Sequence, residues 1–308
     1  LARTSGRETW HGIKIRRLGP SGFSYLSRIA FAANLATQAS LSNFDVLHAH
    51  GVSPGMGAAI ASKGKGASVV TFHGLTYLYP RSLWYRGAGS YKLGKAATRI
   101  LAHHVDSIIA QSSAIKRLLM QLFGEELNER ISIIPHSVDL NRFRFHKYHL
   151  DRERREILYV GTLSRRKGAD VLIRATPRIL REFPEATFAF VGGGPLLHRL
   201  QSMANDLGVR KAVKFRGRLN DSELARCYES CDVFVFPTFG EWLGMVLLEA
   251  MASGRPVVAS RVFGPKDIIT EDIGVLFETG NSEELAEAVI RILSDRKMAA
   301  RMGEKARE

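Results

Sequence analysis

The stretch CDVFVFPTFGEWLGMVLLEAMASGRPVVAS, residues 231–260, contains an apolar run, a loop, a mostly apolar segment and a second apolar run, in that order. The unbroken apolar run at 233–236 is typical of a strand buried on both faces of a parallel sheet. Residues 243–252 are expected to form a helix, which Gly254 can cap, and residues 257–259 begin the next strand. The sequence therefore predicts a strand–helix–strand unit of an α/β fold.

Two carboxylates of this stretch are candidates for ligand binding. Glu241 lies in the loop after the first strand, and Glu249 lies about five residues into the helix, roughly 7.5 Å along its axis. Ligands of parallel sheets bind beyond the carboxyl ends of the strands, so both side chains can face one crevice. No Lys or Arg lies three or four positions from Glu249. Its partner is either a distant Arg or a pair of ligand hydroxyls.

The residues before this stretch continue the alternation of strands and helices. An expected strand at 157–160 leads into the basic loop GTLSRRKG, residues 161–168, and then into a helix at 169–182. Free backbone amides, the helix dipole and cations converge there, so the loop is a candidate anion site, with a solvated turn as the alternative. The other expected elements of this half are strands at 187–191 and 213–217 and a helix at 221–230.

The first half of the chain predicts a second parallel, doubly wound sheet. The expected strands lie at 13–18, 45–49, 68–73, 107–110 and 131–134, and the expected helices at 25–41, 54–62, 90–103 and 113–123. Two of these strands carry histidines, which are His48 and His50 in DVLHAH and His73 in VVTFHG. We expect His48 and His50 to be structural. His73 differs because it stands at the carboxyl end of an apolar strand, where a buried sheet opens onto its crevice.

The spacing of Glu241 and Glu249, with seven residues between them, resembles the signature of retaining glycosyltransferases of family 4. The runs DVLHAHG and VVTFHGL resemble the amino-terminal domain of that family. The loop at 161–168 resembles its diphosphate clamp, and the segment at 213–217 resembles the one that lies against the nucleobase. The resemblance implies the GT-B fold, in which two Rossmann-like doubly wound parallel-sheet domains face each other across a cleft.

The same resemblance implies roles for individual residues. Catalytic roles fall to His73, Glu241 and Lys167. Glu241 would contact the donor sugar, Glu249 the ribose, Lys167 and Arg166 the diphosphate, and His73 would lie near the reacting centre. The residues implied to bind the donor are Gly161, Thr162, Arg166, Lys167, Leu219, Glu241, Leu243, Gly244, Met245, Val246 and Glu249.

The sequence departs from the family pattern within these motifs. Thr162 stands where the family has Arg, so Arg166 is expected to carry the lost charge. Trp242 and Leu243 replace the usual Gly and Phe, which alters the expected donor-sugar pocket. No Gly-rich loop precedes Ile13, and the closing helix ends abruptly. We therefore expect a fragment, which can be inactive by itself.

The expected domains are an acceptor-side domain at 1–138, incomplete at its start, an interdomain linker at 139–156 and a donor-binding domain at 157–308. The linker is charged and has little apolar periodicity. The composition, 45% hydrophobic and 24% charged, is globular. No run of 18 apolar residues exists, and the first 20 residues lack the apolar core of a signal peptide, so we expect a cytoplasmic protein.

Positive charge is concentrated in the first half. Of the formal net charge of +14, residues 1–150 carry 19 Lys and Arg against 7 Asp and Glu, whereas the rest carries 25 against 23. This asymmetry indicates an anionic partner for the first half. Lys92, Lys95 and Arg99 share one arc of an expected helix, after a loop rich in aromatic and basic residues. An anionic membrane surface, at the inner face, is therefore a candidate partner, with a solvated helix face as the alternative.

The expected reaction moves a hexose-type sugar from a nucleoside-diphosphate donor to an unknown acceptor, such as a lipid-linked one, with retention at the anomeric carbon. No cofactor is expected, because the nucleotide sugar is a substrate. No metal is expected, because the chain has no Asp-x-Asp pair and no His or Cys cluster at ligand spacing. The alternatives are a nucleotide-sugar epimerase or phosphorylase of the same fold, or a nucleic-acid-binding protein. The last is suggested by charge alone, and no binding module supports it.

Overall fold

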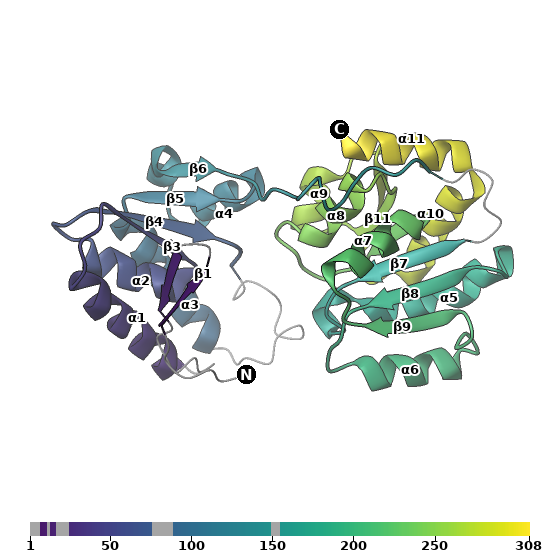
Figure 1. Ribbon diagram of the computed structural model, residues 1–308, viewed down its shortest axis with the longest axis horizontal. Coiled ribbons are helices and arrows are strands. Elements are labelled where there is room, and N and C mark those ends of the chain that lie inside the picture. The colour runs from purple at the N-terminus through teal and green to yellow at the C-terminus, as the bar shows by residue number, and fades with distance from the viewer. Residues whose placement is uncertain (1–6, 11–12, 17–24, 76–88, 149–154) are drawn as a thin grey trace. The chain divides into compact units, whose positions relative to one another are not determined.

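The computed structural model describes the 308-residue chain except for residues 1–6, 11–12, 17–24, 76–88 and 149–154 (Figure 1). The chain divides into two compact units, with the boundary between Pro135 and His136. Each unit is an α/β structure built on a parallel sheet, as the sequence predicts. Among the described residues, no helix is long and apolar enough to cross a membrane.

The second unit is built on a six-stranded sheet. Its strands are β7 (Glu156–Val160), β8 (Thr187–Val191), β9 (Val213–Gly217), β10 (Val233–Phe236), β11 (Val257–Ser260) and β12 (Gly274–Phe277). They lie in the order β12-β11-β10-β7-β8-β9, and every pairing is parallel. This is the Rossmann order, in which the direction of strand addition reverses between β7 and β10. Ligands of such sheets bind beyond the carboxyl ends of the strands at this reversal.

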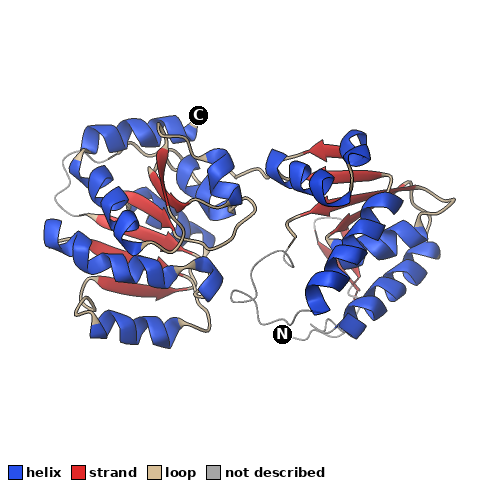
Figure 2. Ribbon diagram, turned by 180° about the vertical axis from the view of Figure 1, so that it is seen from behind, coloured by secondary structure: helices blue, strands red, loops and turns tan. Residues whose placement is uncertain are grey.

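Helices cover both faces of this sheet (Figures 1 and 2). They are α5 (Ala169–Glu182), α6 (Leu197–Asp206), α7 (Asp221–Ser230), α8 (Met245–Ala252), α9 (Phe263–Ile268), α10 (Ser282–Ser294) and α11 (Arg296–Arg307). Alternate strand residues enter two separate cores. Val233 and Val235 join one core, whereas Phe234 and Phe236 join the other. This double burial explains why the strand is an unbroken apolar run.

Most boundaries agree with the sequence prediction, and one differs for a clear reason. The helix expected at 243–252 begins at Met245, because Gly244 precedes it as the N-cap with φ of 89°. Such a positive φ is readily available only to glycine. A Cβ on Gly244 would also lie 2.9 Å from the Phe236 ring, so the helix start packs directly on the end of β10.

The first unit is built on a four-stranded parallel sheet. Its strands are β3 (Val46–His50), β4 (Ala67–Phe72), β5 (Ser107–Ala110) and β6 (Ile131–Ile133), in that spatial order. Its helices are α1 (Tyr25–Ser40), α2 (Val52–Ala61), α3 (Gly89–His104), α4 (Ser113–Phe123) and the 3₁₀ helix η3 (Glu125–Arg130). The elements expected between 25 and 134 are therefore confirmed, with small shifts at their ends.

One predicted strand of the first unit was placed in the wrong sheet. The segment expected at 13–18 forms β2 (Ile13–Arg16), which pairs antiparallel with β1 (Arg7–Trp10) in a separate two-stranded sheet. Only two residues separate these strands in the sequence. Parallel neighbours need a crossover of a dozen or more residues, whereas antiparallel neighbours can be joined by two. The short connection therefore dictates the antiparallel pairing.

The described residues of the segment expected as a linker, 139–148 and 155–156, lie within the second unit. Phe143 and Tyr148 are buried in its two cores. The buried guanidinium of Arg255 donates to the carbonyls of Cys231 and His146, and it lies over the Tyr148 ring. These contacts fasten the segment to the body of the second unit, in spite of its charged sequence.

Glycine allows the loops after β7 and β10 to meet. Gly168 has φ of 66°, and a Cβ there would lie 1.8 Å from the Pro237 carbonyl oxygen. On the other side of β7, a Cβ on Gly192 would lie 2.0 Å from the Gly161 carbonyl oxygen. Real Cβ atoms do not approach oxygen so closely, so glycine is required at both positions. Three neighbouring loops are thereby packed backbone to backbone at the carboxyl edge of the sheet.

We predict that Gly168→Ala destabilises the second unit far more than Gly208→Ala. Gly208 has a similar φ of 70°, but nothing lies within 4 Å of its would-be Cβ. Gly208→Ala should lower the free energy of unfolding only by the strain of a left-handed backbone, about 1–2 kcal/mol. Gly168→Ala should lower the free energy of unfolding by at least about 2 kcal/mol more than Gly208→Ala, because the loop that contains Pro237 must move. Urea unfolding followed by circular dichroism measures both, and equal losses would show that the loop contact is dispensable.

Candidate functional site

Two loops meet at the point of the second sheet where ligands are expected. The first follows β7 and contains a 3₁₀ turn, η4 (Arg165–Lys167), before α5. The second follows β10. The Arg166 carbonyl accepts hydrogen bonds from the Phe239 backbone N–H at 2.7 Å and from the Thr238 hydroxyl at 3.0 Å. The two loops therefore form one rigid structure.

Three charged side chains converge on this structure. The Glu241 carboxylate pairs with the Lys167 ammonium and lies 3.3 Å from Nη1 of Arg166. Arg166 Nη1 also donates to the Gly240 carbonyl at 2.7 Å. The exposed side-chain fractions are 16% for Lys167 and Glu241 and 24% for Arg166, so the cluster is mostly screened from water. The structure thus brings together three of the predicted site residues.

The cluster carries an excess of one positive charge. Burial lowers the pKa of the Lys167 ammonium, and the pairing with Glu241 opposes that shift. The Lys167 Nζ atom also lies over the Phe236 ring, 5.4 Å from its centroid. Two cations held by one carboxylate, close to the start of a helix, form a setting in which an anionic group is favourable.

The neighbouring loops place the remaining predicted residues of the second unit around this edge. Gly161 donates its backbone N–H to the Val191 carbonyl, and Thr162 is exposed. Leu219 follows β9 and is half-buried. The segment at 243–246 opens α8, with Met245 exposed and Leu243 buried. The first backbone N–H groups of a helix have no partner within it, so this segment can offer donors to a ligand.

Glu249 lies one turn further along α8 and has an unexpected partner. Its Oε2 accepts a 2.8 Å hydrogen bond from the hydroxyl of Tyr228 on α7. The positive charge of Arg142 also acts on this carboxylate, although Arg142 itself pairs with Asp221 at 3.0 Å. Burial raises the pKa of the Glu249 carboxyl, although the hydrogen bond from Tyr228 opposes the shift. A carboxylate kept in such a place at a cost in stability is typical of functional sites.

The three histidines that the sequence singled out lie at or near the carboxyl edge of the first sheet. His50 Nδ1 lies 2.7 Å from His73 Nε2, and Gln111 Nε2 contacts His73 Nδ1. His48 is bonded separately to the Thr71 hydroxyl at 2.7 Å. Sequence reasoning singled out His73 but missed its two partners. Gln111 could have been found, because it directly follows the expected strand at 107–110 and so lies at the same edge.

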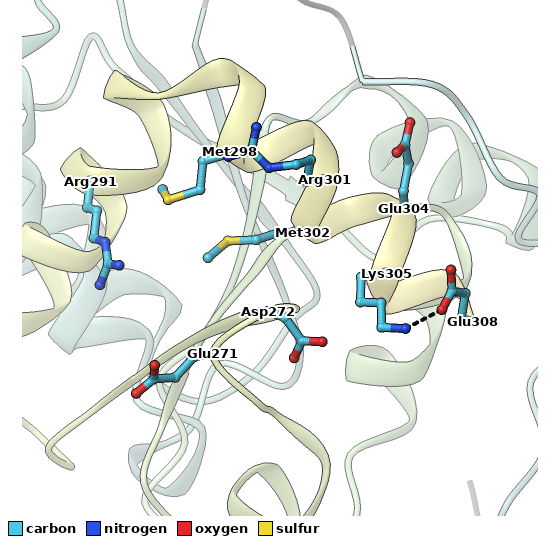
Figure 3. A pocket seen from close by; sticks show the side chains of 9 residues that line it. All are labelled: Glu271, Asp272, Arg291, Met298, Arg301, Met302, Glu304, Lys305 and Glu308. Atoms are coloured by element: carbon cyan, nitrogen blue, oxygen red, sulfur yellow. Dashed lines mark hydrogen bonds and ion pairs between the residues drawn. The ribbon is translucent and has the colours of Figure 1, made fainter.

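A surface pocket of the second unit lies away from the predicted site residues. Figure 3 shows a surface pocket lined by α11, the end of α10 and the turn before β12, with Met298 and Met302 between acidic and basic side chains. None of the predicted site residues lines it. Among the described residues, no group of three or more His, Cys, Asp or Glu is arranged to hold a metal ion.

Two known families together match almost the whole chain. The family described as Glycosyl transferases group 1 matches residues 141–308, which is more than half of the chain. The chain belongs to this family. The family described as Glycosyltransferase Family 4 matches residues 2–142. The two matches together confirm the family that the sequence predicts.

Two curated relatives show how far the similarity of the group 1 chain extends. It is 33% identical over 227 residues to the GDP-mannose-dependent alpha-(1-6)-phosphatidylinositol monomannoside mannosyltransferase of Mycolicibacterium smegmatis, covering 68% of this chain and 59% of that protein. It is 32% identical over 282 residues to a sulfoquinovosyl transferase of Arabidopsis thaliana, covering 86% of this chain and 52% of that protein. The chain spans between half and three-fifths of the length of these relatives.

Solved structures confirm the fold of the group 1 chain. The structure of HepE of Anabaena in complex with UDP matches this chain with a TM-score of 0.76 at 23% identity. The match covers 90% of this chain and 76% of the HepE chain. The structure of sucrose-phosphate synthase of Thermosynechococcus elongatus matches with a TM-score of 0.80 at 23% identity, and the match covers 97% of this chain and 79% of the synthase chain. These likenesses confirm the predicted GT-B fold of two parallel-sheet α/β units.

We predict that Glu249→Gln stabilises the second unit at neutral pH. The raised pKa means that the folded state holds the Glu249 proton more tightly than the unfolded state. Stability is therefore lost as pH rises from the ordinary carboxyl pKa through the raised one, and a neutral amide avoids this loss. Urea unfolding of both proteins should give a larger advantage for Glu249→Gln at pH 7 than at pH 4. A variant that is less stable at pH 7 would contradict the prediction.

Proposed function

We propose that the protein is a retaining glycosyltransferase, which moves a hexose-type sugar from a nucleoside-diphosphate donor to an acceptor. The observation that carries the proposal is the convergence of Lys167, Arg166 and Glu241 at the strand reversal of the second unit. Family membership adds support, since the curated relatives are named as glycosyltransferases. Those relatives are longer than this chain, so the catalyst that we propose is the whole protein.

The proposed roles follow from charge. During transfer, negative charge grows on the departing diphosphate while the sugar becomes positively charged. Lys167 and Arg166 would stabilise the diphosphate, and their fixed positions on packed loops mean that little reorganisation is needed. Glu241 would orient the sugar hydroxyls, and Glu249 would bind the ribose. His73 would hydrogen-bond near the reacting centre.

The backbone of the second unit would complete the donor site. The N–H groups at the start of α8, from Gly244, Met245 and Val246, suit phosphate oxygens. Gly161 and Thr162 would line the phosphate side, and Leu219 would lie against the base. Leu243 is buried and would shape the sugar pocket through packing.

The donor and acceptor classes are proposed from the relatives. The mannosyltransferase of M. smegmatis is named for GDP-mannose and for a phosphatidylinositol monomannoside, and HepE was solved with UDP. UDP-glucose and GDP-mannose are therefore the first donors to test. A nucleotide-sugar epimerase or phosphorylase of the same fold is the alternative, and incubation of the donor without acceptor distinguishes it, because an epimerase would isomerise the sugar.

We predict that nucleotide release is independent of metal. The whole protein is incubated with UDP-glucose or GDP-mannose, without and with candidate acceptors, in the presence and absence of EDTA. Side-chain cations and backbone amides would meet the diphosphate, so no divalent ion is needed to neutralise it. UDP or GDP should be released at the same rate with EDTA. Complete loss with EDTA, restored by Mg²⁺ or Mn²⁺, would overturn this mechanism.

We further propose that α3 associates with the anionic inner face of a membrane. Lys92 and Arg99 are exposed, and the exposed apolar side chains Leu93 and Ile100 lie beside them. Lys95 is half-buried. Basic and apolar side chains on one exposed helix face suit an interfacial helix. The aromatic and basic loop before this helix falls at 76–88, outside the described residues.

We predict that the protein pellets with anionic vesicles but not with neutral ones, and that high salt releases it. Each basic residue near an anionic surface contributes about 1 kcal/mol. The triple variant Lys92→Ala, Lys95→Ala and Arg99→Ala should therefore lose binding. The triple variant Arg199→Ala, Lys211→Ala and Lys214→Ala removes the same charge from exposed positions of the second unit and should retain it. An equal loss of vesicle binding in both variants would contradict the proposal, because binding would then depend on the net charge of the protein and not on α3.

A further inference from the structure

A row of side chains crosses the carboxyl edge of the first sheet. His50 is the last residue of β3, His73 follows β4, and Gln111 follows β5, and these strands are neighbours. Gln111 is only 3% exposed, so its amide is held by the protein interior. His50 and His73 are exposed, and their rings stack with centroids 5.0 Å apart. The row therefore runs from a fixed buried group to two histidines at the surface.

The contacts impose an order on the protons of this row. The Gln111 amide nitrogen can only donate, so His73 Nδ1 must accept. A neutral imidazole that accepts at Nδ1 carries its proton on Nε2. That proton points at His50 Nδ1, 2.7 Å away. His50 consequently accepts at Nδ1 and carries its own proton on Nε2.

His50 is itself held on its other side. The His48 ring lies beside it, with centroids 4.6 Å apart, and His48 is anchored by its bond to the Thr71 hydroxyl. The β3 backbone ends at His50, and the Gly51 N–H donates to the Thr71 carbonyl at 3.0 Å. His50 is thus placed by its strand, by a neighbouring ring and by His73, although its surface is open.

We infer that His50 is a positioning residue, which acts with Gln111 to keep His73 in one ring orientation, in the tautomer that Gln111 dictates. Bonds at both ring nitrogens, from Gln111 at Nδ1 and to His50 at Nε2, hold the ring plane more firmly than the Gln111 bond does by itself. This inference rests on the proposed function, in which His73 works near the reacting centre. It assigns to His50 a role beyond the structural one that the sequence suggested.

Substitutions at His50 separate positioning from packing and from acid–base chemistry. His50→Asn keeps a polar atom bonded to Cγ, as Nδ1 is in histidine, and so can still hydrogen-bond His73. It removes Nε2 altogether. His50→Ala removes both nitrogens. Because His50 is exposed, neither substitution leaves a buried cavity.

The rate of UDP-glucose or GDP-mannose hydrolysis is the first readout. His50→Ala should lower kcat about 10- to 100-fold, the usual range for loss of a group that orients a functional histidine, and should leave KM for the donor unchanged. His50→Asn should recover most of the rate. Equal rates for His50→Ala and the unaltered protein would overturn the inference. So would a His50→Asn variant as slow as His50→Ala, because the working atom would then be Nε2.

Nitrogen-15 NMR of the histidine rings is the second readout, and it needs no substrate. In the unaltered chain the His73 signals, assigned through a His73→Gln variant, should show a neutral ring with its proton on Nε2. His50→Ala should keep this tautomer, which the Gln111 amide imposes, but should shift and broaden the His73 signals because the ring has lost its bond at Nε2. His50→Asn should restore the signals of the unaltered chain. A His73 proton on Nδ1 in the unaltered chain, or spectra unchanged by His50→Ala, would overturn the inference. If the whole protein turns over no donor, the proposed function fails, and these spectra still decide the arrangement of the row.

Discussion

The candidate donor site depends on the backbone contact between the loops that follow β7 and β10. Gly168 lies against the Pro237 carbonyl so closely that no side chain fits, and the Arg166 carbonyl is bonded to the second loop. This contact occurs where the order of strand addition reverses, so the two loops come from neighbouring strands far apart in sequence. Lys167 and Glu241 meet because the backbones that carry them are already joined.

This arrangement places charge where it costs stability. Burial lowers the pKa of Lys167 and raises that of Glu249, so both groups are less easily charged than they would be in water. Lys167 is compensated by Glu241, and Glu249 by the Tyr228 hydroxyl and by the charge of Arg142. Such partial compensation is expected of a site that awaits a polar ligand, because the ligand supplies the missing interactions. Pure structural packing would favour apolar side chains at these positions.

Most of the helices and strands could be predicted from the sequence, because the periodicity of apolar residues and the chemistry of turns are local properties. Apolar runs and glycine caps predict the strands and helices closely, and the spacing of Glu241 and Glu249 predicts the family. Interactions between distant residues could not be predicted. Nothing local indicates that Tyr228 would meet Glu249, or that His50 would bond His73, because each pair is brought together by packing of separate elements. The antiparallel pairing of Ile13–Arg16 was missed although its two-residue connection required it.

We propose that the charged cluster at the strand reversal binds a nucleoside diphosphate. Calorimetric titration of UDP and GDP, each compared with uridine and guanosine, tests this claim most directly on Lys167→Met and on the exposed control Lys211→Met. Lys167→Met should weaken diphosphate binding by about 1.5–3 kcal/mol, the range for a hydrogen bond to a charged group, and should leave nucleoside binding unchanged. Lys211→Met should bind all four ligands as the unaltered protein does. Equal affinity of Lys167→Met and the unaltered protein for UDP and GDP would contradict the proposal.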